Sequence, residues 1–189
     1  MKKTFTLFFI TLLSVFAVHA ADINYCLCAT TTGGTKVNSE NQNVKKDLWD
    51  DQISYTPELS LTKGKKYTLV FKVKASEPCT VGFWPIWNAS PNKNQWGGSN
   101  DVQYVKSSDV TTEWKSLRIT FTADFDHDGL DFVFGGLNGS IYFDDFKLVE
   151  SGVGVNIFTN GDFAANNTNG WSSKSAYNGT KISIADAQI

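Results

Sequence analysis

One stretch of the sequence combines flat aromatic side chains with planar amides. The segment GFWPIWNASPNKNQWGG, residues 82–98, places Trp84, Trp87 and Trp96 among asparagines and a glutamine. Aromatic rings stack on the apolar C–H face of a sugar ring, and amides exchange paired hydrogen bonds with its hydroxyl rim. The segment therefore has the chemistry of a sugar-binding surface.

Period-two alternation identifies residues that accompany these tryptophans. If Phe83 faces a core, its neighbour Trp84 faces outward, and the same reasoning places Ile53 inside and Gln52 outside. Arg118 follows Leu117 and precedes Ile119, so it also faces outward. We predict that Trp84, Gln52 and Arg118 share the open face of one sheet. The full set of predicted ligand-binding residues is Trp84, Trp87, Trp96, Gln52, Arg118 and Tyr104.

A structural explanation of the tryptophans stays open beside this one. Exposed aromatic side chains often only cover the ends of a sandwich, and then they bind nothing. Trp49 and Trp114 share the phase of core residues, so we expect them to be buried in the core.

The elements that must position these residues are strands. KYTLVFKVKA (66–75) and WKSLRITFTA (114–123) alternate apolar and polar residues, which is typical of strands with one buried face. Further short strands are separated by turns such as GGLNGS. No segment after residue 20 has a helical apolar period. The pattern predicts an all-β fold, a β-sandwich jelly roll like that of galactose-binding domains.

The chain begins with MKKTFTLFFITLLSVFAVHA, which we interpret as a cleaved signal peptide at residues 1–20. Its apolar run is shorter than the roughly 20 residues that span a bilayer, and no second such run follows, so no membrane span is predicted. We expect a secreted, periplasmic or cell-surface protein. Without Lys2 and Lys3, the 17 basic residues become 15 against 19 acidic ones, a formal net charge of −4. This charge argues against a nucleic-acid partner.

Three cysteines remain in the exported chain, at Cys26, Cys28 and Cys79. In an oxidising compartment one pair could form a disulfide, and the alternatives are Cys79 with Cys26 or with Cys28. Three small buried apolar residues are an equally open interpretation.

Three stretches in order carry a family resemblance. They are LWDDQISYTPELSLTKGKKYTLVFKVKA, TTEWKSLRITFTAD and GSIYFDDFKLVE. Together they resemble the carbohydrate-binding modules of the CenC type, families four, nine and twenty-two, over residues 49–150. The resemblance implies a jelly roll whose cleft-facing aromatics and amides hold a glycan, here Trp84 and Gln52.

The order of one family motif is unusual. Such modules usually begin with a strand ending in Asn-Gly-Asp-Phe, followed by Gly-Trp, but here these motifs stand at 160–163 and 170–171. We divide the chain into the signal peptide 1–20, a carbohydrate-binding sandwich 21–150 and a tail 151–189. The tail is either the beginning of a truncated second module or a segment that folds back and completes the first.

A structural calcium is also implied by the resemblance, with Asp144, Asp145 and Asp162 as metal ligands. Ala164 stands where the family has a glutamate ligand. A second pattern, DFDHDG at 124–129, has the opening of a calcium loop. Its twelfth position is Gly135 in place of the required glutamate, so an acidic turn explains it equally well.

The predicted function is non-catalytic binding of a polysaccharide of the β-glucan or xylan type, with a glycoside hydrolase as a partner that the module assists. The exported chain has one histidine, His127, and no nucleophile elbow or metalloprotease motif, so no enzyme activity is predicted. Two alternatives remain. The chain is a truncated part of a glycoside hydrolase without its catalytic domain, or it is a surface or adhesion sandwich that binds protein.

Overall fold

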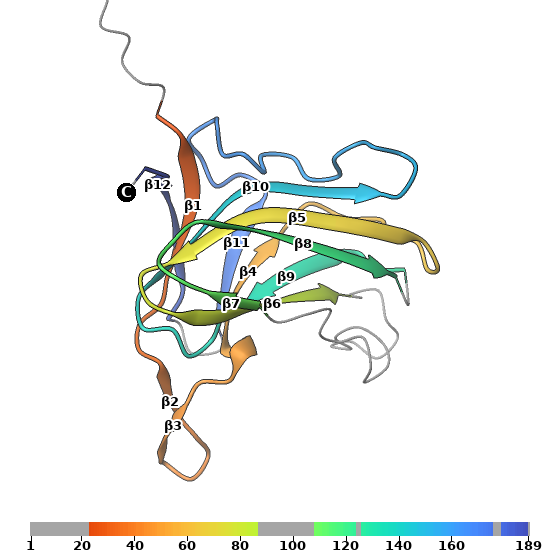
Figure 1. Ribbon diagram of the computed structural model, residues 1–189. Coiled ribbons are helices and arrows are strands. Elements are labelled where there is room, and N and C mark those ends of the chain that lie inside the picture. The colour runs from red at the N-terminus through yellow and green to blue at the C-terminus, as the bar shows by residue number, and fades with distance from the viewer. Residues whose placement is uncertain (1–22, 87–107, 124–125, 176–178, 189) are drawn as a thin grey trace, which may run out of the picture.

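The computed structural model describes residues 23–86, 108–123, 126–175 and 179–188. Within them the chain forms a sandwich of two five-stranded sheets, and all strand pairs are antiparallel. Figure 1 shows the two layers, with the β2–β3 hairpin projecting from one end. The predicted all-β sandwich is confirmed.

Each sheet combines strands from distant parts of the sequence. The first sheet has the order β12-β1-β10-β5-β8, formed by Lys181–Asp186, Tyr25–Thr30, Ser140–Glu150, Lys66–Ala75 and Lys115–Thr122. The second has the order β11-β4-β9-β6-β7, formed by Trp171–Ser175, Asp51–Tyr55, Gly129–Val133, Cys79–Ile86 and Ser108–Val110. Between β1 and β4 lie β2 (Thr35–Val37), β3 (Asn43–Lys45) and a 3₁₀ helix, η1 (Leu48–Asp50).

Aromatic side chains fill the space between the sheets. Phe146 of β10 is at their centre, with ring-centroid distances of 4.4 Å to Trp171 and 4.9 Å to Phe132. Phe71 of β5 stacks on the same ring at 5.3 Å. Buried aromatic rings contribute large apolar areas, so this cluster joins the two sheets into one core.

The tail is part of the same sandwich. β11 pairs with β4 and β12 pairs with β1, so the tail supplies one strand to each sheet (Figure 1). The segment before β11 runs along β10, where the Ile157 amide donates to the Leu148 carbonyl at 2.7 Å and the Phe146 amide to the Gly161 carbonyl at 2.9 Å. A side chain at Gly161 would place Cβ 2.4 Å from the Phe146 carbonyl oxygen, so only glycine permits this approach. The described part of the tail therefore contributes a strand to each sheet of the sandwich.

A buried ion pair attaches the tail at the other end of the sheets. The Lys46 ammonium lies 2.9 Å from the Asp51 carboxylate, and both side chains are almost fully buried. The Thr180 hydroxyl donates to the same carboxylate at 2.7 Å. Because a buried charge is costly without partners, Thr180 helps to compensate Asp51 and couples the tail to β4.

Candidate functional site

The outer face of the second sheet carries the aromatic and amide residues that the sequence predicts. We call it the Gln52 face and define it by Gln52, Ser54, Trp84, Asp131 and Val133. Register pairs Trp84 with Asp131 and Asp131 with Ser54, which makes one row across three strands. A second row joins Gln52, Val133 and Gly82. All five defining side chains are buried.

Gln52 carries an acceptor that its surroundings do not satisfy. Its Nε2 donates to the Trp49 carbonyl at 2.7 Å, which fixes the orientation of the amide. Its Oε1 is buried and has no hydrogen-bond partner. A buried acceptor without a partner costs about 1–3 kcal/mol. An incoming hydroxyl donor would therefore gain a favourable contact at this atom.

Hydroxyl and carboxylate groups continue the polar character of the face. The Ser54 hydroxyl donates to the Asp131 carboxylate, and both side chains are buried between neighbouring strands. A carboxylate accepts several hydrogen bonds at once, so Asp131 is suited to orienting hydroxyl groups around it.

Trp49 lies next to the Gln52 face and was missed as a site residue. It is the middle residue of η1, and its side chain is 47% exposed. Lys36 holds this short helix by contacts of 2.5 Å to Asp47 and 2.6 Å to Asp50. These hydrogen bonds raise the pKa of Lys36 above its usual range. The short helix thus carries an exposed indole, and its backbone carbonyl orients the Gln52 amide.

The core prediction for Trp49 and Trp114 is wrong. Trp49 is on the surface because it lies in a 3₁₀ turn, where the apolar–polar alternation of the following strand β4 does not hold. Trp114 precedes β8 and is half-buried outside the core, where its Nε1 donates to the Ala187 carbonyl at 2.9 Å. The signal that could have revealed Trp49 is the Asp-Leu-Trp-Asp sequence, because its two aspartates form a capping box at the start of the short helix.

The structure brings together two of the predicted ligand-binding residues. Trp84 and Gln52 share the Gln52 face, although both are buried, with exposed fractions of 7% and 8%. The prediction that Arg118 shares this face is wrong. Arg118 is exposed on β8, which belongs to the first sheet, because alternation indicates the phase of a strand but not its sheet. The remaining predicted ligands, Trp87, Trp96 and Tyr104, lie outside the described residues.

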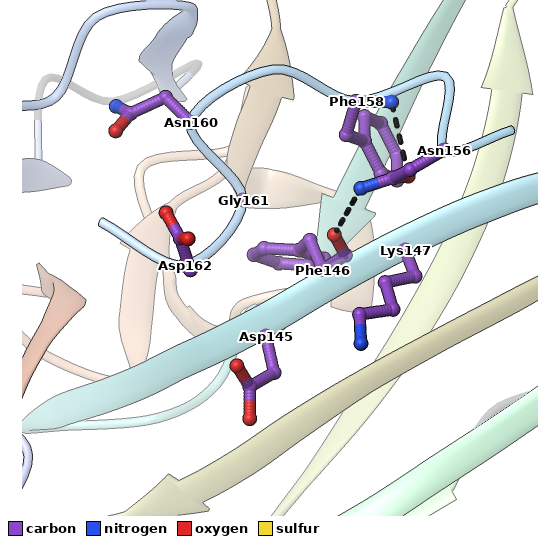
Figure 2. Close-up of a pocket in the computed structure, with 8 residues that line it drawn as sticks. All are labelled: Asp145, Phe146, Lys147, Asn156, Phe158, Asn160, Gly161 and Asp162. Atoms are coloured by element: carbon purple, nitrogen blue, oxygen red, sulfur yellow. Dashed lines mark hydrogen bonds between the residues drawn. The ribbon is translucent and has the colours of Figure 1, made fainter. Parts of the chain in front are cut away.

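A small pocket lies where the tail crosses β10. It has a volume of about 140 Å³ and is lined by Asp145, Phe146, Lys147, Asn156, Phe158, Asn160, Gly161 and Asp162. Figure 2 shows the Asp162 carboxylate beside the segment that carries Gly161, whereas the Asp145 carboxylate points away on the other side of the β10 ribbon. Asp145 also forms a 2.7 Å ion pair with Lys72.

The three predicted metal ligands do not form one cluster. Asp144 is absent from the lining of this pocket, and its buried carboxylate accepts from Asn24 at 3.0 Å. Burial raises the pKa of Asp144. Among the described residues no group of three or more His, Cys, Asp and Glu side chains is arranged to hold a metal ion. The separation arises at an irregularity in the β10–β5 register between Asp144 and Lys147, where Asp145 has a positive φ.

The described part of DFDHDG forms a tight connection between strands. The Asp126 carboxylate accepts from the Lys63 amide at 2.7 Å, and His127 pairs with Leu61 in an isolated bridge. Asp124 lies outside the described residues. These backbone contacts fit the interpretation of an acidic turn.

The cysteines are free thiols in two different sheets. Cys26 and Cys28 lie on β1 of the first sheet, and Cys79 lies on β6 of the second. Burial, with a smaller effect of Asp144, raises the pKa of Cys26 to about 12. Burial and the nearby Glu77 raise the pKa of Cys79 to about 11. Both thiols therefore stay protonated at neutral pH and are poor nucleophiles.

Among the described residues, no helix has the length and apolar character needed to cross a membrane.

No protein-family model matches this chain, and none of the curated proteins matches it. The fold is similar to that of a carbohydrate-binding module of PbXyn10C in its ligand-free form, with 26% identity, coverage of 90% of this chain and 93% of that one, and a TM-score of 0.67. The xylan-binding CBM22-1 domain of Paenibacillus barcinonensis Xyn10C is 19% identical, with 65% and 85% coverage and a TM-score of 0.39. The N-terminal cellulose-binding domain of Cellulomonas fimi β-1,4-glucanase C is 18% identical, with 66% and 88% coverage and a TM-score of 0.43. The predicted resemblance to carbohydrate-binding modules is confirmed, and of these three only the first supports an inference about this chain.

Proposed function

We propose that this chain is a non-catalytic module that binds a polysaccharide of the β-glucan or xylan type on the Gln52 face. The observation that carries the proposal is the similarity, over 90% of the chain, to a ligand-free carbohydrate-binding module. The chemistry of the Gln52 face agrees with it, because aromatic, amide and hydroxyl groups are the groups that bind sugars.

In this proposal each residue has a distinct task. The exposed indole of Trp49 stacks on a sugar ring, and the Gln52 Oε1 accepts a hydrogen bond from a sugar hydroxyl. Trp84 and Asp131 form the floor of the site. Because the Gln52 oxygen is buried, a local rearrangement must expose it when a ligand enters. Binding is an equilibrium, and affinity in the micromolar to millimolar range is expected from a few such contacts.

Affinity gel electrophoresis tests this function. The purified protein is run through gels that contain xylan, β-glucan, a soluble cellulose derivative or mannan, and its mobility is compared with a gel without polysaccharide. Retardation in the xylan or β-glucan gel supports the proposal. Free migration in every gel would overturn it for these glycans.

Substitution of Trp84 separates glycan binding from the alternatives. We expect Trp84→Ala to weaken retention at least 10-fold, with Trp84→Phe as the variant that keeps a ring in the same place. Circular dichroism melting shows whether each variant is folded. Unchanged retention in a folded Trp84→Ala protein would mean that the ring is structural, and would favour a protein-binding sandwich.

Location and partnership are part of the same proposal. We propose that residues 1–20 direct export and that the module keeps a glycoside hydrolase near its substrate. The first point is tested by isolating the chain from outside the cytoplasm and measuring its mass. The mass should match a chain whose first residue is near position 21. Absence of catalysis stays a prediction, and release of reducing sugar from the bound glycan would contradict it.

We also propose a structural calcium at the pocket that Asp145 and Asp162 line. The pocket lining contains Asp162, Asp145 and the amides of Asn156 and Asn160, and such oxygen groups suit a cation that prefers oxygen ligands, with water completing its coordination. Lys72 competes for Asp145, so binding should be weak. A rise in melting temperature with added Ca²⁺ that disappears in Asp162→Asn would support the site. No shift at millimolar Ca²⁺ would contradict it.

A further inference from the structure

The outer face of the first sheet is strongly basic, and the proposed glycan site does not involve it. Alternation places the residues opposite the core on β5, β8, β10 and β12 on this surface. We call it the basic face and define it by the cationic residues Lys66, Lys72, Lys74, Arg118, Lys147 and Lys181. The whole chain has a formal net charge of −2, so this face is far more positive than the protein as a whole.

The centre of this face is a row across three neighbouring strands. Val70 of β5 is paired with Arg118 of β8 on one side and with Lys147 of β10 on the other. Arg118 and Lys147 are exposed, and within the described residues neither forms an ion pair. Adjacent strands lie about 4.8 Å apart, so the backbone positions of Arg118 and Lys147 are about 10 Å apart, with an apolar residue between them.

The acidic residues of the face do not neutralise this row. The Asp145 carboxylate is engaged with Lys72 at 2.7 Å. Asp144 is buried, accepts from Asn24, and has a raised pKa because of that burial. The positive field of Arg118 and Lys147 therefore reaches solvent.

Aromatic and hydroxyl groups accompany the cations. The Lys74 ammonium lies 5.2 Å from the ring centroid of Trp114 and 5.3 Å from that of Tyr142, and both rings are half-buried. The hydroxyl groups of Thr68 and Thr120 lie 3.3 Å apart near the central row. Rings, hydroxyls and separated cations together fit a sugar polymer better than a uniformly charged one.

We propose that the basic face is a second binding surface, which takes polysaccharides that carry carboxylates, such as chains of uronic acids. Charge complementarity joins Arg118 and Lys147 to carboxylates of the polymer, and a guanidinium binds a carboxylate with two parallel hydrogen bonds. The two long strands β5 and β10 run side by side through this sheet (Figure 1), which gives the face length along the strand direction. Nucleic acid is a poorer fit, because its closely spaced phosphates favour a denser set of cations in a basic protein.

The test compares an acidic with a neutral polysaccharide. Wild type, Arg118→Glu, Lys147→Glu and the double variant are run in gels with polygalacturonate or β-glucan, and each mobility is divided by that in a plain gel. Lys45→Glu on the exposed β2–β3 hairpin is the matched control, since it makes the same change in charge elsewhere. All substituted side chains are exposed, and circular dichroism melting confirms folding.

We expect retention by polygalacturonate to fall at least 10-fold in the double variant and less than about 2-fold in Lys45→Glu, with β-glucan retention unchanged. Free migration of wild type in polygalacturonate would overturn the proposal, as would equal losses in Lys45→Glu. Stronger retention by single-stranded DNA, lost in the same variants, would assign the face to nucleic acid instead. Because the neutral gel reports on the Gln52 face separately, failure of one surface does not imply failure of the other.

Discussion

The two outer faces of this sandwich are built by the same alternation but differ in what they present. On the Gln52 face the outward residues are buried amide, hydroxyl, carboxylate and aromatic groups. On the basic face the outward residues are mostly exposed lysines, threonines and Arg118. Buried polar groups select a ligand by the geometry of hydrogen bonds, whereas exposed cations attract it over a distance that salt shortens. The two proposed binding surfaces thus differ in their mode of recognition.

The largest expected difference between the faces is in stability. Asp131→Ala removes the acceptor of the buried Ser54 hydroxyl, so we expect the free energy of unfolding to fall by about 2–3 kcal/mol. Arg118→Ala removes an exposed side chain and should change it by less than about 0.5 kcal/mol. Urea denaturation of both variants measures the contrast. Equal losses would show that the basic face is as tightly coupled to the core as the Gln52 face.

This contrast also marks how far the sequence could predict the structure. Alternation along β5 and β8 predicts which residues face the core, and it places Gln52 and Trp84 outward, as observed. It does not indicate which strands share a sheet, because that depends on pairings between distant segments. For this reason alternation alone predicts Arg118 beside Gln52 and Trp84, whereas its strand β8 belongs to the other sheet.

Other features depend on long-range contacts that no local pattern contains. The ion pair of Lys46 with Asp51 is compensated by Thr180, which is 129 positions further along the chain than Asp51. The short helix at Trp49 lies directly before β4 and does not follow the alternation of that strand, so alternation predicts a core position for an indole that is exposed. Whether a residue faces inward or outward can be predicted from its neighbours only within one uninterrupted strand.

Two tryptophans outside the core provide the next test of the comparison. We expect Trp49→Ala to weaken retention by neutral β-glucan or xylan by roughly 2- to 10-fold, because stacking on an aromatic ring is worth about 0.5–1.5 kcal/mol. Trp114→Ala, beside the basic face, should leave neutral retention unchanged. Affinity gels measure both, with melting temperatures as the check on folding. If Trp114→Ala weakened neutral retention and Trp49→Ala did not, the neutral glycan would have to be assigned to the basic face instead.

The salt dependence of polysaccharide retention should also differ between the two faces, by a smaller factor. Raising NaCl from about 50 to 200 mM shortens the screening length from roughly 14 to 7 Å. We therefore expect retention by polygalacturonate to fall several-fold, and retention by β-glucan to change by less than about 2-fold. Gels run in parallel at the two salt concentrations give both values. Salt-independent retention of the acidic polymer would mean that Arg118 and Lys147 do not attract it through charge.

The smallest effect concerns the thiols of the two sheets and appears only at alkaline pH. Unfolded cysteine ionises near pH 9, whereas burial keeps Cys26 protonated to about 12 and Cys79 to about 11. The unfolded state therefore binds fewer protons above pH 9, and stability falls as pH rises through these windows. In Cys26→Ala and Cys79→Ala the corresponding part of the fall should disappear.

Urea midpoints measured at intervals from pH 8 to 11.5, as differences from wild type, isolate each thiol from the lysines that titrate nearby. The difference for Cys79→Ala should level off near pH 11, while that for Cys26→Ala should continue to grow, because the first sheet buries its thiol more deeply. Identical profiles would show that the two thiols are equally protected from ionisation in the two sheets. The contrast between the faces would then be confined to their outward side chains.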